Sequence, residues 1–174
     1  MEYTAQPIPA PTEPQKASGF IERVRAEGWP VGIVVILLWE GYAALTPIAS
    51  LPCPTVMLGN QMYTGFLAGA YNLATAFIIG AGVYGIFNRK LWGKWVIIAY
   101  QLLAALMTSM HTFIFALQPE EVLSVYRQFF GTLPAETVDP LLSFITMMLP
   151  VFAWVQTLLI GGYLLYKKGW FEGK

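Results

Sequence analysis

Cysteine and histidine, which supply many of the metal ligands and catalytic groups of proteins, are almost missing from this sequence, which has only Cys53 and His111. A single cysteine excludes an internal disulfide, a thiol redox pair and a cysteine metal cluster. A single histidine with no second group of ligands argues against a haem, zinc or di-iron site. We therefore expect no metal and no cofactor.

Charged residues are also scarce: they make up 11% of the 174 residues, whereas 56% are hydrophobic. This charged share is roughly half of that in a soluble domain, so the composition indicates an integral membrane protein. A membrane-spanning helix needs about 20 apolar residues. Four stretches meet this length, residues 31–51, 63–87, 91–117 and 140–166. We predict an all-α fold, a multi-pass bundle of four transmembrane helices over residues 30–168, with no second domain.

Motifs of several enzyme classes are absent as well. The sequence contains no Gly-rich phosphate loop, no nucleophile elbow and no nucleic-acid-binding signature. Kinase and serine-hydrolase chemistry can be set aside, and membrane lipids rather than nucleic acids are the expected surroundings.

The residues before the first span divide into two segments. Residues 1–16 are polar and rich in proline, a composition that cannot bury enough apolar area to fold, so we predict a disordered tail. Residues 17–29 place apolar side chains at helical spacing among charged ones, which predicts a short amphipathic helix lying along the membrane surface. A second surface helix is expected to start at Pro119 in the longest loop.

The basic residues predict the orientation of the bundle. Nine of the ten fall on the side that holds both termini and the loop between the second and third spans, and only Arg127 falls opposite. Because cytoplasmic loops carry the excess of lysine and arginine, both termini are predicted to be cytoplasmic. Lys94 lies close enough to the end of its span for its ammonium group to reach water.

Glu40 is the one charged residue that cannot avoid the bilayer interior, because it lies ten residues into the first span. At a rise of about 1.5 Å per residue, Asn72 and Gln101 reach a similar depth, with Gln156 somewhat nearer the cytoplasm. Hydrocarbon offers no hydrogen bonds, so we expect these side chains to face one another. The aromatic residues that flank them are Tyr42, Tyr71, Tyr100 and Trp154.

Two interpretations of this polar layer stay open. Asparagine and glutamine often hold transmembrane helices together, and an uncharged Glu40 could join such a network. Helix association alone does not require a carboxyl group, however, so the layer could also line a functional cavity. In that case Glu40 is the candidate proton donor or acceptor, and the other seven residues are candidate ligand contacts.

The run from Val83 to Thr108 resembles the EXPERA family, which includes the emopamil-binding sterol isomerases and the sigma-2 receptor type proteins. The similarity lies in a basic turn, a tryptophan and an Ile-Ile-Tyr-like segment that opens the next helix. The matching residues here are Trp92, Ile97, Ile98 and Tyr100.

Two further matches are the Glu40-Gly41-Tyr42 triplet and Pro150 in the fourth span. The resemblance implies a four-helix bundle of an endomembrane with a cavity for a sterol-like ligand. In the isomerases of this family, acidic and histidine side chains move a double bond by protonation and deprotonation, and Glu40 is the one residue that carries over, as a candidate acid.

Three functions therefore remain possible at this point. The protein could bind an apolar sterol- or lipid-like molecule, with isomerase-type proton chemistry at Glu40. It could be a non-catalytic accessory or structural subunit of a larger membrane complex. A proton-coupled transporter is the third possibility, since four helices with one glutamate in the first are similar in plan to small multidrug exporters.

Overall fold

A computed structural model describes residues 20–58, 61–129 and 135–172, so the predicted disordered tail lies outside the described residues. The fold is all-α apart from one small hairpin. In the described part of the chain, four helices are long and apolar enough to cross a membrane, as predicted. They are α2 (Val31–Ala49), α3 (Phe66–Phe87), α4 (Leu91–Leu117) and α6 (Ala135–Tyr166). The protein is therefore a multi-pass membrane protein built as a four-helix bundle.

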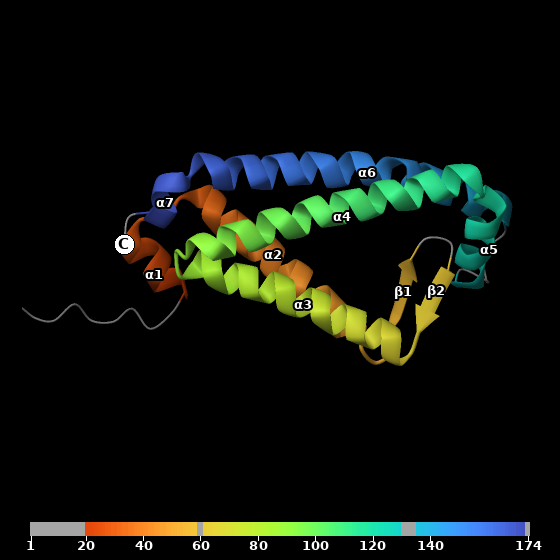
Figure 1. The fold of residues 1–174 in the computed structure, drawn as a ribbon, viewed down its shortest axis with the longest axis horizontal. Helices are drawn as coiled ribbons and strands as arrows, with labels where there is room; N and C mark the ends of the chain where they lie inside the picture. The colour runs from red at the N-terminus through yellow and green to blue at the C-terminus, as the bar shows by residue number, and fades with distance from the viewer. Residues whose placement is uncertain (1–19, 59–60, 130–134, 173–174) are drawn as a thin grey trace, which may run out of the picture.

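The four helices pack in chain order: α2 contacts α3, α3 contacts α4, and α4 contacts α6, whereas α2 and α6 touch much less. Figure 1 shows α3 and α4 together at the end where the first and last helices, α1 (Phe20–Glu27) and α7 (Lys168–Glu172), lie, here called the terminal end, and apart at the opposite end. Their close approach depends on Gly85 and Gly93, because a Cβ added to Gly85 would lie 2.5 Å from the Cα of Gly93. Small residues at a helix crossing allow the backbones to meet in this way.

Two short helices, α1 (Phe20–Glu27) and α7 (Lys168–Glu172), lie at the terminal end. The first lies within the segment predicted to be an amphipathic helix; its position on a membrane surface stays a prediction. Arg89, in the turn between α3 and α4, joins both helices. Its guanidinium forms an ion pair of 2.5 Å with Glu27 and lies 3.8 Å from the ring centre of Trp170.

Lys94 does not reach solvent as the sequence predicted. Only 3% of the residue is exposed, and its ammonium group lies over the rings of Trp95 and Phe171. The sequence places Lys94 correctly near the end of α4, but α7 folds back over that end. The contact between α7 and α4 is a tertiary one that the spacing of Lys94 could not indicate.

The opposite end, here called the hairpin end, carries an antiparallel hairpin that the sequence analysis missed. Its strands are β1 (Thr55–Leu58) and β2 (Gln61–Thr64), with Val56 opposite Tyr63. Because β2 uses residues assigned to the second span, α3 begins at Phe66 rather than at residue 63. Helix α5 (Pro119–Phe129) begins where predicted and contacts β2, while α6 begins five residues before the expected 140.

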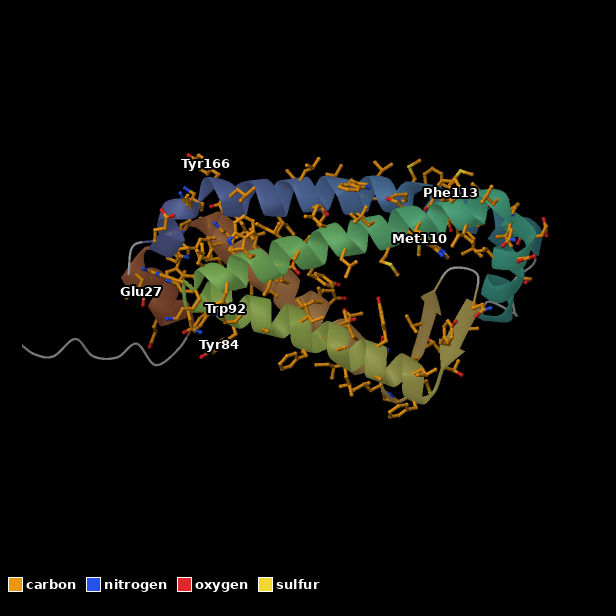
Figure 2. All side chains as sticks on the ribbon, in the orientation of Figure 1. Glu27, Tyr84, Trp92, Met110, Phe113 and Tyr166 are labelled. Carbon is orange, nitrogen blue, oxygen red and sulfur yellow. The ribbon has the colours of Figure 1, made fainter. Side chains whose placement is uncertain are left out.

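The outer faces of the four long helices are apolar and exposed. Tyr84, Phe113 and Tyr166 are 65%, 64% and 77% exposed, and Figure 2 shows them pointing away from the bundle. Such a surface is typical of contact with lipid, since a soluble monomer rarely exposes apolar patches of this extent. The buried positions of α2 show the opposite face: Ile33, Ile36, Leu37 and Glu40 follow the spacing of one helix stripe.

Candidate functional site

Glu40 is fully buried between α2 and α4, on the stripe of α2 that faces the bundle. Its carboxyl oxygen Oε1 accepts a hydrogen bond of 2.5 Å from the amide nitrogen Nε2 of Gln101. Gln101 is 4% exposed and lies on the inner face of α4. The expected meeting of these two polar side chains is therefore found, and neither of them faces lipid.

Gln156 extends this contact to α6. Its nitrogen Nε2 donates to Oε1 of Gln101 across 3.3 Å. Nearby, the hydroxyl of Thr157 donates to the backbone oxygen of Gln101 at 3.1 Å. We call the linked side chains of Glu40, Gln101 and Gln156 the amide chain. It ties three transmembrane helices together at polar groups that hydrocarbon could not satisfy.

The second carboxyl oxygen of Glu40 differs from the first in its hydrogen bonding. Oε2 is enclosed, and no hydrogen bond to it is formed by any residue that the structure describes. Leaving a buried polar atom unpaired costs roughly 1–3 kcal/mol, so a group needed only to join helices would be expected to have both oxygens bonded. The free oxygen is the feature of Glu40 that helix association does not explain.

Asn72 does not join the amide chain, which corrects the predicted layer. Its side-chain nitrogen donates instead to the hydroxyl of Ser50, at 2.8 Å, just past the end of α2. The error comes from the hairpin: because α3 starts at Phe66, Asn72 is only seven residues into its helix. It therefore lies nearer the hairpin end than Glu40 does.

The flanking aromatic residues are also distributed differently from the prediction. Tyr42 and Tyr71 are 69% and 43% exposed, so both lie toward the outside of the bundle. The indole nitrogen of Trp154 donates to the hydroxyl of Ser109 at 3.0 Å, away from Glu40. Tyr100 is half-buried and packs against the main hydrophobic core. A ligand-binding role for these four residues stays a prediction.

A groove of about 710 Å³ lies between α2 and α6, and the sequence analysis missed it. Its lining is aromatic and aliphatic apart from Gln156; the residues are Gly32, Val35, Ile36, Trp39, Phe152, Val155, Gln156, Leu159, Ile160 and Tyr163. Its volume falls within the range of small-molecule sites, about 300–1,000 Å³. We call it the α2–α6 groove. Apolar residues that line it have no sequence signal to distinguish them from residues that face lipid.

Gly32 shapes one end of the groove. The ring of Tyr163 lies directly over Gly32, where any side chain would collide with it. The groove exists because α2 and α6 touch little along their length. A second, smaller groove of about 390 Å³ lies between α2 and α3 and has no acidic or basic lining residue.

Glu40 lines neither groove; Gln156 is the member of the amide chain that does. The carboxyl group is thus separated from the α2–α6 groove by two successive hydrogen bonds. Direct proton transfer from Glu40 to a molecule in the groove would require rearrangement of the amide chain. A molecule bound in the groove can contact Gln156 without any rearrangement of the amide chain.

Among residues 20–58, 61–129 and 135–172, no three His, Cys, Asp or Glu side chains lie close enough to hold a metal ion. Compared with family models, curated proteins and solved structures, the chain shows no significant match. The EXPERA resemblance therefore stays a prediction.

Proposed function

We propose that this membrane protein binds an apolar, lipid-like small molecule in the α2–α6 groove. The observation that carries the proposal is the groove itself, a space of ligand size whose one strongly polar lining residue belongs to a buried hydrogen-bonded chain. Binding sites for small molecules are typically apolar with a few placed polar groups. The EXPERA resemblance favours the same class of ligand, one similar to a sterol.

Glu40 has a supporting role in this proposal. Its hydrogen bond positions Gln101, and Gln101 in turn positions Gln156 at the groove wall. Isomerase-type chemistry would need the ligand to reach Glu40, which is enclosed. We therefore propose a binding function, and proton transfer by Glu40 only as a further step that requires opening of the amide chain.

Photolabelling can test the proposal in the full-length protein reconstituted into phospholipid nanodiscs. The probe is a hexadecanol that carries a diazirine group in its chain. We expect saturable labelling of peptides from α2 and α6 that line the groove, reduced by an excess of unlabelled hexadecanol. Labelling that is equal on all outer faces and cannot be saturated would overturn the proposal, because it would mean that ordinary acyl chains fill the groove.

Two tryptophan substitutions on α6 form a matched pair for this experiment. Val155 lines the groove, whereas Leu158 is 69% exposed and does not. We expect Val155→Trp to fill the groove and abolish saturable labelling, and Leu158→Trp to leave it unchanged. The alternative of an accessory subunit is favoured by a different pair of results. Neither variant would alter labelling, and the protein extracted gently with detergent from its native membrane would migrate on a native gel only as part of a larger particle.

A further inference from the structure

The hydrogen bonds of the amide chain run in one direction. Gln101 uses its NH₂ group to donate to Glu40, which leaves its carbonyl oxygen to face α6. Gln156 must then use its own NH₂ group to donate to that oxygen. A carboxyl oxygen that accepts at one end thus orients both amides.

The last oxygen of the amide chain is Oε1 of Gln156, and it has no donor among residues 20–58, 61–129 and 135–172. No described residue donates a hydrogen bond to Oε1 of Gln156, and this oxygen is not among the enclosed unpartnered atoms, which are Glu40 Oε2, Arg89 Nε and Trp170 Nε1. Oε1 is therefore not enclosed by protein, and the α2–α6 groove is a space that Gln156 lines. Acyl chains have no group that could donate to it.

The lining also restricts the charge of a ligand. Among the residues that the structure describes, no aspartate, glutamate, lysine, arginine or histidine lines the α2–α6 groove. Gln156 lies ten residues before the end of α6 at Tyr166, which places it about 15 Å along the helix from that end. An ionised group at that depth, without a counter-charge, would be costly.

From these observations we propose that the ligand is a neutral lipid with a hydrogen-bond donor, such as a hydroxyl group, that donates to Oε1 of Gln156. The inference rests on the proposed function of the α2–α6 groove. It assigns Glu40 a positioning role: by accepting from Gln101, it turns the NH₂ group of Gln156 toward Gln101 and leaves Oε1 of Gln156 as the acceptor for a ligand. The groove should therefore distinguish an alcohol from its methyl ether, which can only accept.

Competition against the diazirine-bearing hexadecanol tests this inference, with hexadecanol and hexadecyl methyl ether as unlabelled competitors. One neutral hydrogen bond corresponds to a difference of about five-fold in affinity, so we expect hexadecanol to compete about five-fold better than the ether. If both compete equally, the inference is wrong and the proposed function stands. If neither competes, the proposed function fails as well.

Two isosteric or near-isosteric variants separate recognition from folding. Gln156→Met keeps the length of the side chain but removes its oxygen, so the preference for the alcohol should disappear while both competitors still bind. In Glu40→Gln the new amide can either donate to Gln101 or accept from it, so the orientation of Gln101 is no longer fixed. We expect the preference for hexadecanol over the methyl ether to become smaller. A full five-fold preference retained by Gln156→Met would contradict the proposal. Leu158→Met, on the outer face of α6 and outside the groove lining, is the control, and we expect it to keep the preference.

Discussion

Glu40 on α2 and Gln101 on α4 form a buried hydrogen bond of 2.5 Å between helices that are not neighbours in the chain. The bond turns the carbonyl group of Gln101 toward α6, while the other oxygen of Glu40 has no partner in the part of the chain that the structure describes. The pair thus joins α2 to α4 and, through Gln101, contacts the glutamine at the groove wall.

This pair predicts a stability difference that single substitutions alone would not reveal. Gln101→Leu leaves both oxygens of Glu40 without a partner, so we expect the free energy of unfolding to fall by about 1–3 kcal/mol. The double variant Glu40→Leu/Gln101→Leu removes both groups and should recover most of this loss. Unfolding titrations in mixed detergent micelles would measure both values. A double variant less stable than Gln101→Leu alone would contradict this account of the pair.

The contact of Gly85 with Gly93 predicts intolerance of even one methyl group. Gly85→Ala would force α3 and α4 apart at the terminal end, because the added Cβ lies 2.5 Å from the backbone of α4. We expect a loss of about 1–3 kcal/mol, as in overpacked cores. Gly80→Ala on the same helix is the control, since nothing lies within 4 Å of a Cβ added there. Equal stability of the two variants would show that the helices do not cross at Gly85.

The contacts of Arg89 predict that the turn after α3 holds the terminal end together. Arg89→Ala removes the ion pair with Glu27 and the stacking on Trp170, and we expect it to cost about 1–2 kcal/mol. Lys90→Ala, at the exposed neighbouring position, removes the same charge and should change stability little. Thermal unfolding compares the two variants. Faster proteolysis after α6 in Arg89→Ala alone would further indicate release of α7.

The orientation of the bundle can be measured with the single native cysteine. Cys53 is exposed and lies in the chain between α2 and the hairpin, on the side predicted to be non-cytoplasmic. We expect Cys53 to be labelled by a membrane-impermeant maleimide that is added to the outside of intact cells or of sealed right-side-out vesicles. The matched control is Cys53→Ser/Lys168→Cys, whose new thiol lies at an exposed position of α7. Labelling of the control but not of the native protein would reverse the predicted topology.

The number and approximate positions of the membrane helices could be read from the sequence, because a bilayer requires long apolar segments and these are visible as composition. The meeting of Glu40 with Gln101 could be expected for a related reason: buried polar groups need partners, and these two residues lie at matching depths. The depth of Asn72 could not be predicted in the same way, because it depends on the residue at which α3 begins. The sequence did contain a hairpin signal: polar and apolar residues alternate in Thr55–Leu58 and Gln61–Thr64, and Gly59-Asn60, a common turn pair, lies between them. We interpreted this stretch as part linker and part transmembrane span.

The sequence by itself determined that this is a multi-pass helical membrane protein with one acidic group in its interior, because hydrophobic length and the cost of burying charge act on each segment separately. Only the tertiary structure decided that α2 and α6 stand apart to leave a groove, that Gln156 rather than Glu40 reaches it, and that Lys94 is covered by α7. These features depend on the angles and contacts between helices, which an apolar residue's identity does not specify: the same leucine or valine can face lipid, a neighbouring helix or a ligand.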